Sequence, residues 1–310
     1  MQKYWKKFSF ILGFFCLGLF LSGCSEEKSE DKVKILATTT VVGDVAKHLI
    51  GDEIEVDVLM GPGVDPHGYT PTARDVDRIL ESDLVLVSGL HLEGRMGEVF
   101  QGLERKGVGV YALTDGISRE KLLEEAPGVY DPHVWWDPVL WADTILPLSE
   151  YLGEQFPEFR DLIYKRGEMY REEILNLDAE NREKIETIPK ERRVLVTAHD
   201  AFSYFARAYG FEVWSIQGLN TNDEAGAGKM DSLAASLAER EIPAIFAEKG
   251  LSVKSVEVLL EAAQGYGYEA KIGGHLNSDS LGEDGSGEEN YVGAVRGNVE
   301  RVVVSLRGEK

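Results

Sequence analysis

The stretch VKILATTTVVGDVAKHLIGDEIEVDVL (residues 33–59) decides the fold class. It begins with an apolar run, passes through three threonines into a segment with helical apolar spacing, stops at Gly51 and ends in the alternating segment IEVDVL. A change of apolar period from strand to helix and back to strand is typical of a βαβ unit. Residues 33–59 therefore predict the start of an α/β domain with a parallel sheet.

The same order of elements returns in the second half of the chain. RVLVTAHDAFSYFARAYGFEVWSI (193–216) again predicts a strand, a turn, a helix, a glycine stop and a strand. We therefore expect an α/β protein with two similar lobes built on central parallel sheets, residues 33–156 and residues 189–310. Further strands are expected at 84–88, 108–113, 244–248 and 268–272, and further helices at 72–82, 231–240 and 252–264.

One long helix is expected between the lobes. Residues 158–188 contain no proline and one glycine, Gly167. A helix over this range would span about 45 Å, enough to run along both lobes. We predict a linking helix within residues 157–188, and two shorter helices that break near Gly167 are the alternative. Its apolar stripe is expected to serve packing and comprises Phe159, Leu162, Ile163, Tyr170, Ile174, Leu177 and Ile185.

The first residues of the chain predict export. A basic start (KYWKK, 3–7) precedes an apolar run that matches a signal peptide in length and is short for a membrane span. It ends in LSGC, which resembles the lipobox of bacterial lipoproteins, so we expect a signal peptide at 1–23 and lipid on Cys24. Residues 24–32 are polar and predict a flexible tether. An ordinary N-terminal membrane anchor is the alternative, and both readings place the body outside the cytoplasm, in the periplasm or at the cell surface.

Composition limits the classes of partner. The chain has 310 residues, a formal net charge of -21 and 2 Cys. So much negative charge argues against nucleic acid or an anionic membrane surface as the main partner, and it suits a cation as ligand. Two cysteines exclude a disulfide scaffold and a metal cluster built from thiolates.

Six histidines carry most of the functional signal. Two of them lie in the same tripeptide, Asp65-Pro66-His67 and Asp131-Pro132-His133. Both tripeptides are expected in loops that follow strands, where α/β folds place their ligand sites. Proline restricts the backbone before each imidazole, and the aspartate could orient a ring N–H. The tripeptides therefore predict two metal ligands, with two solvated histidines in turns as the alternative.

His199 and Asp279 occupy comparable positions in the second half, in VTAHD (196–200) and NSDSLG (277–282). Two ligands from each lobe would place a site in the cleft between the lobes. His275 lies four residues before Asp279 and is an alternative ligand. His48, inside a predicted helix, and His91, in a predicted surface loop, are interpreted as structural.

These segments together resemble the periplasmic or surface lipoproteins that bind zinc or manganese for ABC-type metal importers. The resemblance implies that His67, His133, His199 and Asp279 are the four ligands of one metal ion, held between two lobes that a backbone helix bridges. It also implies a monomer that is attached to the membrane by lipid and delivers its ion to permease and ATPase subunits. The matching segments follow the family's order over nearly the whole mature chain: the lipobox, GPGVDPHGYTPTARD (61–75), SGLHLEGRM (88–96), DPHVWWDP (131–138), VTAHDAFSYFARAYG (196–210), AEKGLSVKSV (247–256) and SDSLGE (278–283).

The expected donors favour zinc. Three imidazoles and one carboxylate suit four- or five-coordinate Zn²⁺, whereas Mn²⁺ prefers more oxygen ligands. Many manganese-dedicated members of the family have Glu where His199 stands. The His-rich loop of many zinc-dedicated members is missing from residues 114–130. We expect zinc first and manganese second, with iron as a further alternative.

Two other functions use the same residues. A mononuclear zinc hydrolase would keep an open position on the metal and would need a general base, for which Glu248 is the candidate. A metal-stabilised surface adhesin would use the ion for folding alone. Four protein ligands close the coordination sphere, so we expect a carrier rather than an enzyme.

Overall fold

The computed structural model describes residues 33–221 and 226–307. The predicted signal peptide, the lipid attachment at Cys24 and the tether lie outside the described residues. Within the two described ranges, no helix combines the length and the apolar character that a membrane crossing requires.

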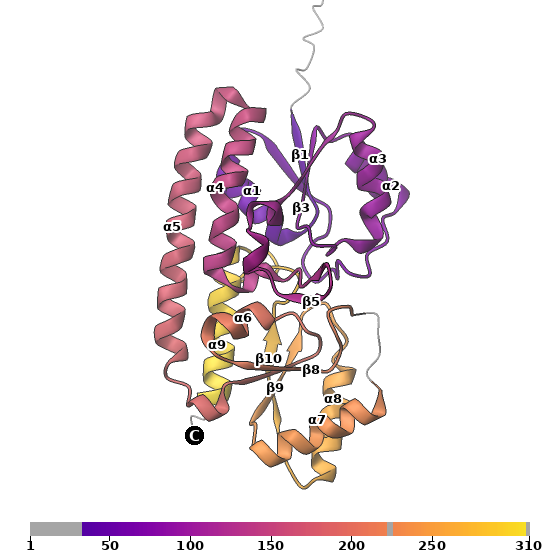
Figure 1. The fold of residues 1–310 in the computed structure, drawn as a ribbon, viewed down its shortest axis with the longest axis vertical. Helices are drawn as coiled ribbons and strands as arrows, with labels where there is room; N and C mark the ends of the chain where they lie inside the picture. The colour runs from indigo at the N-terminus through magenta and orange to yellow at the C-terminus, as the bar shows by residue number, and fades with distance from the viewer. Residues whose placement is uncertain (1–32, 222–225, 308–310) are drawn as a thin grey trace, which may run out of the picture. The chain divides into compact units, whose positions relative to one another are not determined.

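The first lobe is built on a parallel sheet in the order β2-β1-β3-β4 (Figure 1). β1 is one of the two inner strands of this sheet, and Thr38 follows its last residue. The strands are β1 Lys34–Ala37, β2 Glu55–Val58, β3 Leu84–Val87 and β4 Gly109–Ala112. The helices are α1 Thr40–Ile50, α2 Ala73–Leu80 and α3 Gly97–Glu104, and a small antiparallel hairpin follows with β5 Glu124–Ala126 and β6 Val129–Tyr130.

The second lobe repeats this topology. Its sheet has the order β10-β9-β7-β8 and is parallel as well, so β7, β8, β9 and β10 correspond in turn to β1, β2, β3 and β4. The expectation of two similar α/β lobes with central parallel sheets is thereby confirmed. The strands are β7 Val194–Thr197, β8 Glu212–Ser215, β9 Ala244–Glu248 and β10 Lys271–Leu276, and the helices are α6 Ser203–Tyr209, α7 Ala227–Arg240 and α8 Lys254–Gly265.

Equivalent glycines end the first helix of each lobe. Gly51 follows α1 with φ +70°, and Gly210 follows α6 with φ +73°. Residues with a Cβ rarely adopt this backbone conformation, so glycine is the natural residue for turning the chain back into the sheet. At the other end of α1, the hydroxyl of Thr39 accepts a hydrogen bond from the N–H of Val42 and caps the helix.

Three long helices lie along one flank of the two sheets, and α5 among them runs beside both lobes (Figure 1). They are α4 Pro138–Gln155, α5 Arg160–Ile185 and α9 Tyr291–Arg307, and α5 packs against α1, α4 and α9. The helix does not break at Gly167. A Cβ on Gly167 would lie 2.2 Å from the Oγ of Ser149, so this glycine allows α5 to approach α4 closely. The expected apolar stripe is buried except near its start, where Leu162 is exposed.

The last strand differs from its expected position. Residues 268–272 were expected as a strand, but β10 runs from Lys271 to Leu276. The sequence pattern did not indicate a strand over residues 273–276, because Gly273 and Gly274 have low strand propensity. Gly273 is needed for packing, since a Cβ there would lie 2.7 Å from the ring of Phe246 on β9. The register of β10 on β9 shifts between Ile272 and Gly274.

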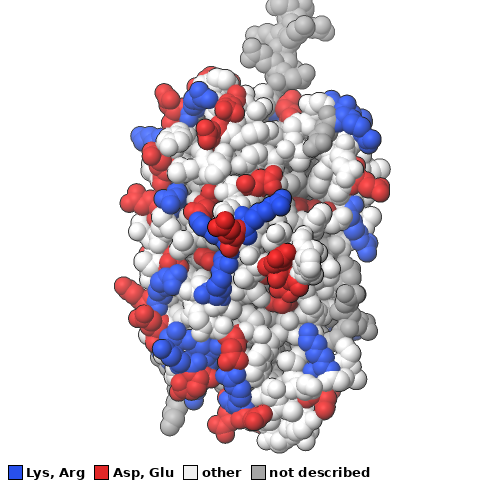
Figure 2. Space-filling model, in the orientation of Figure 1, with Lys and Arg blue, Asp and Glu red and all other residues white. Residues whose placement is uncertain are grey.

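The two lobes share a continuous apolar core along the flanking helices, which includes Leu49 of α1, Ile145 of α4, Ile174 of α5, Phe205 of α6 and Val299 of α9. Basic and acidic side chains are interspersed over the face of the molecule shown in Figure 2, so the negative charge does not gather there into one patch. Short 3₁₀ turns complete the described residues: η1 Gly94–Met96, η2 Leu113–Gly116, η3 Arg119–Lys121, η4 Val134–Trp136, η5 Pro157–Phe159 and η6 Lys190–Arg192.

Candidate metal centre

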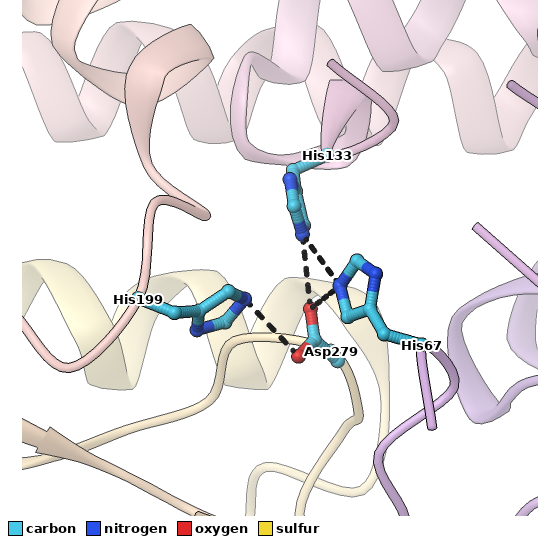
Figure 3. Close-up of side chains that lie close together, drawn as sticks. All are labelled: His67, His133, His199 and Asp279. Atoms are coloured by element: carbon cyan, nitrogen blue, oxygen red, sulfur yellow. Dashed lines mark hydrogen bonds and ion pairs between the residues drawn. The ribbon is translucent and has the colours of Figure 1, made fainter. Parts of the chain in front are cut away.

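Four side chains from both lobes converge on one point (Figure 3). His67 lies in the loop between β2 and α2, and His133 lies between β6 and η4. His199 follows β7, and Asp279 follows β10, so both stand at carboxyl ends of strands of the second sheet. One ligand atom from each of the four residues lies within 4.8 Å of the others, and all four residues are buried. The structure thus brings together the four residues that the sequence singled out.

The spacing of these atoms is that of a small coordination sphere. The Nε2 atoms of His67 and His133 are 3.1 Å apart. One carboxylate oxygen of Asp279 lies 3.3 Å from the Nε2 of His133, and its other oxygen lies 3.3 Å from the Nε2 of His199. Ligand atoms bound tetrahedrally at about 2.0–2.1 Å from Zn²⁺ are roughly 3.3 Å from one another. The donors are therefore spaced for one metal ion among them.

Unsatisfied polar atoms face this point. The Nε2 of His199 and the Oδ1 of Asp279 are buried, and neither makes a hydrogen bond within the described part of the chain. Two imidazole nitrogens in direct contact, as in His67 and His133, also need a shared proton or a cation between them. Buried polar atoms without partners are costly, and a bound cation would satisfy all of them. The chemistry of the donor set therefore fits a divalent transition metal.

Two carboxylates fix the rings of two histidines from behind. The Nδ1 of His133 lies 2.7 Å from the Oδ1 of Asp131, and the Nδ1 of His199 lies 2.5 Å from the Oε2 of Glu248. The same carboxylates also accept the backbone N–H groups of His133 and His199, both at 2.9 Å. A proton held on Nδ1 leaves the lone pair of Nε2 free to point at the metal position.

These carboxylates also change how the histidines titrate. Burial lowers the pKa of His133, but the charge and the hydrogen bond of Asp131 outweigh burial and raise it to about 9. Burial likewise opposes the charge on His199, yet the charges of Glu248 and Asp279 raise the pKa of His199 well above its ordinary value. Burial raises the pKa of Asp279, whereas the charge of His199 and contacts with the histidines lower it well below its usual range. A metal ion entering this site must displace protons.

The two Asp-Pro-His tripeptides differ in the structure. The expectation that the aspartate orients a ring N–H is confirmed at Asp131. Like Asp131, Asp65 accepts the backbone N–H of the histidine two residues later, here His67 at 2.9 Å, through one oxygen. Its other oxygen accepts the hydroxyl of Thr221 from the second lobe, at 2.5 Å. The identical tripeptides therefore share the backbone contact and differ in the further partner of the aspartate, which is the ring of His133 for Asp131 and Thr221 for Asp65.

The loop that carries Asp279 is held by two tryptophans of the first lobe. The indole N–H groups of Trp135 and Trp136 both donate to the carbonyl oxygen of Ser278, at 3.0 and 2.9 Å. Both rings are fully buried, and the hydroxyl of Tyr291 on α9 donates to the carbonyl of Trp135. Sequence reasoning missed this contact, although the two tryptophans lie only two and three residues after His133.

The other candidate residues lie outside the cluster. The Nδ1 of His48 bonds to the carbonyl of Asp44, and its ring stacks on Tyr170 with centroids 4.0 Å apart. His91 is exposed in a loop, with φ +66°. His275 is an exposed residue of β10. Glu248, the candidate general base, bonds to His199 through both of its carboxylate oxygens.

Comparison with known proteins agrees with this geometry. The family model described as "Zinc-uptake complex component A periplasmic" (ZnuA) matches residues 35–304. The chain is similar to the zinc-binding protein TroA of Treponema pallidum, with 43% identity over 286 residues that cover 92% of each chain. It is also 37% identical to the manganese-binding lipoprotein MntA of Bacillus subtilis, over 93% of this chain and 95% of that one. The solved structure of the periplasmic zinc-binding protein TroA superposes with a TM-score of 0.86 over 89% of this chain and 99% of that chain.

Proposed function

Because the chain belongs to the periplasmic zinc-uptake complex component A family, we propose that it captures one divalent transition-metal ion outside the cytoplasm and delivers it to an ABC-type importer. The observation that carries this proposal is the convergence of four buried ligand atoms from two lobes within 4.8 Å. The ion is cargo. Permease and ATPase subunits in the membrane would receive it and drive its import.

We assign the four metal ligands as His67, His133, His199 and Asp279. The three imidazoles bind through Nε2, and Asp279 turns one oxygen toward His133 and the other toward His199. This placement lets the carboxylate bind through one oxygen or through both, which gives four or five coordination. Neutral imidazoles are required for binding, so acidification should release the ion.

Zinc is the proposed first cargo and manganese the second. Three nitrogen donors and one carboxylate suit Zn²⁺, and such a site binds Zn²⁺ more tightly than Mn²⁺ by the Irving–Williams order. Relatives named as zinc-binding and as manganese-binding both align over more than nine-tenths of this chain. The metal content of protein purified from its own cell envelope identifies the physiological ion: zinc supports the first choice, whereas manganese or iron would mean that metal availability sets the cargo.

We propose that the chain works as a monomer anchored through lipid on Cys24, with its body in the periplasm or at the cell surface. The sequence LSGC at the end of the apolar N-terminal run supports this anchor. Mass spectrometry of the N-terminal peptide from native protein tests it. A diacylglyceryl group on Cys24 is expected, and an uncleaved N-terminus would contradict the anchor.

We also propose that the metal serves transport and not catalysis. Four protein ligands fill a tetrahedral sphere and leave no position for a reactive water. Glu248, the candidate general base of a hydrolase, uses one oxygen for the ring of His199 and the other for its backbone N–H. Unfolding of the protein on removal of the metal would instead favour the adhesin alternative, in which the ion serves folding alone.

Calorimetric titration with Zn²⁺, in competition with a chelator, tests the ligand assignment. We expect one equivalent in the wild-type protein. Single variants His67→Ala, His133→Ala and His199→Ala should bind far more weakly and keep the circular dichroism spectrum of the folded lobes. His48→Ala is the matched control. His48 lies outside the cluster of four ligands, where it bonds to Asp44 and its ring stacks on Tyr170. Unchanged stoichiometry and affinity in His199→Ala would refute the four-ligand assignment.

A further inference from the structure

A second charged cluster adjoins the ends of β9 and β10 and is centred on Glu288. One oxygen of its carboxylate accepts hydrogen bonds from the Nζ of Lys249 at 2.7 Å and from the side-chain amide of Asn277 at 2.9 Å. The other oxygen is paired with the guanidinium of Arg301. Burial raises the pKa of Glu288, but these donors outweigh burial and lower it, so the carboxylate is ionised at neutral pH. All three partners donate to Glu288.

Glycines bring Glu288 into this position. A Cβ on Gly297 of α9 would lie 2.3 Å from the Oε1 of Glu288, and a Cβ on Gly282 would lie 2.8 Å from the Cβ of Glu288. The N–H of Gly282 also donates to the backbone carbonyl of Glu288 at 2.7 Å. The segment before α9 is therefore packed tightly on the Asp279 loop, and small residues permit its approach.

Glu288 joins the ends of two strands that lead to the metal centre. Glu248 and Leu276 are the last paired residues of β9 and β10. Lys249 directly follows β9 and Asn277 directly follows β10, and Glu288 bonds to both of them. Glu248, which bonds to His199, directly precedes Lys249, and Asp279 lies two residues after Asn277.

The Asn277 side of this junction is reinforced from α9. Asn298 accepts the backbone N–H of Asn277 at 2.9 Å and donates to its carbonyl at 2.7 Å. Arg301 reaches Asn298 as well as Glu288. The backbone of Asn277, two residues before Asp279, is thus fixed by the side chain of Asn298 on α9. Glu288 links Asn277 to Lys249, because it bonds to both side chains.

We propose that Glu288 is a positioning residue that fixes Asp279 and His199 relative to each other, through Asn277 and through Lys249 with Glu248. The inference rests on the proposed metal-binding function. Its action is indirect, because Glu288 bonds to Lys249 and Asn277, which are neighbours of Glu248 and Asp279 in the chain. Its effect is to hold the two second-lobe ligands in binding geometry before the ion arrives, which slows the escape of the ion once it is bound.

Glu288→Gln is the direct test, because glutamine keeps the shape and adds an N–H₂ group where every partner is a donor. We expect the rate of Zn²⁺ loss to a chelator to rise about tenfold, the smallest effect typical of groups that bond directly to metal ligands, because Glu288 acts through intermediate residues. In the Co²⁺-loaded protein, the visible absorption bands should shift, because they report the geometry around the ion. Lys249→Met removes only the tie to the Glu248 turn and should have a smaller effect in the same direction.

Glu53→Gln is the control, because Glu53 also pairs with an arginine, Arg166, but lies before the first residue of β2, whereas His67 follows the last residue of that strand. It should leave the Zn²⁺ loss rate and the Co²⁺ spectrum unchanged. If Glu288→Gln and Lys249→Met lower the melting temperature of the metal-free protein but leave both readouts at wild-type values, the residue is merely structural and the inference is overturned. Failure of the wild-type protein to bind metal would instead contradict the proposed function, and this inference with it.

Discussion

Replacing Glu248 by glutamine removes the support of His199 without changing the shape of the side chain. In the wild-type protein, the carboxylate accepts the backbone N–H of His199 at 2.9 Å and its ring Nδ1–H at 2.5 Å. A glutamine offers one acceptor oxygen and one N–H₂ donor. If the oxygen faces the ring, the N–H₂ group meets the backbone N–H. If it faces the backbone, Nδ1 must accept, and its proton moves to Nε2, the atom that should bind the metal.

The size of this effect follows from burial and charge. His199 and Glu248 have exposed fractions of 0% and 2%, so water cannot replace the lost acceptor. A hydrogen bond to a charged group contributes about 1.5–3 kcal/mol. At about 1.4 kcal/mol per factor of ten, Zn²⁺ affinity should fall about 10- to 100-fold. Partners that orient the ligands of other metal sites have effects of the same size.

Competition with a chromophoric chelator measures the change in affinity of Glu248→Gln, and circular dichroism of the metal-free form verifies that the lobes remain folded. Glu212→Gln is the control, because Glu212 pairs with Arg240 at an exposed position of the same lobe. It should bind Zn²⁺ as the wild-type protein does. An affinity of Glu248→Gln within twofold of wild type would refute the reasoning that this carboxylate sets the tautomer of His199.

Three further predictions address other parts of the structure. His275→Ala should bind Zn²⁺ with unchanged affinity in calorimetric titration, because His275 is an exposed residue of β10; weaker binding would make it a ligand. Burial lowers the pKa of His133, but Asp131 raises it from 6.5 to about 9, so protonated His133 stabilises the metal-free protein fully below pH 6.5, and this contribution is lost as pH rises through 9. The gain in melting temperature on adding Zn²⁺ should therefore grow from pH 6 to pH 9, and a gain that shrinks would contradict this linkage. Thr72→Ala removes the N-cap of α2 and should lower the free energy of unfolding by about 1 kcal/mol in denaturant titration, with metal affinity retained; unchanged stability would argue against the capping box.

Periodicity and glycine stops were sufficient to predict most of the fold. The repeated order of strand, helix, glycine and strand at residues 33–59 and 193–216 predicted two similar lobes with parallel sheets, and the structure adds that the two sheets have the same strand order. The last strand was misplaced because Gly273 and Gly274 break the apolar pattern. Glycine is required at position 273 by tertiary packing, since the ring of Phe246 occupies the space that a side chain there would need. Local sequence does not record such packing.

The candidate site was predictable as far as its residues follow strands in recognisable motifs. His67 and His133 were marked by a repeated tripeptide, and His199 and Asp279 by their places after strands. The supporting contacts were harder to predict, because they join residues far apart in the chain. Glu248 lies 49 residues from His199 in sequence. The contact of Asp65 with Thr221 likewise joins residues 156 positions apart.

The central claim is that the four converging side chains bind one metal ion. A crystal structure of the Zn²⁺-loaded protein, with anomalous data collected on both sides of the zinc absorption edge, tests it most directly. We expect one strong anomalous peak, about 2.0–2.2 Å from the Nε2 atoms of His67, His133 and His199 and from an oxygen of Asp279. A peak elsewhere on the molecule, or no zinc peak among these four side chains at saturating Zn²⁺, would contradict it.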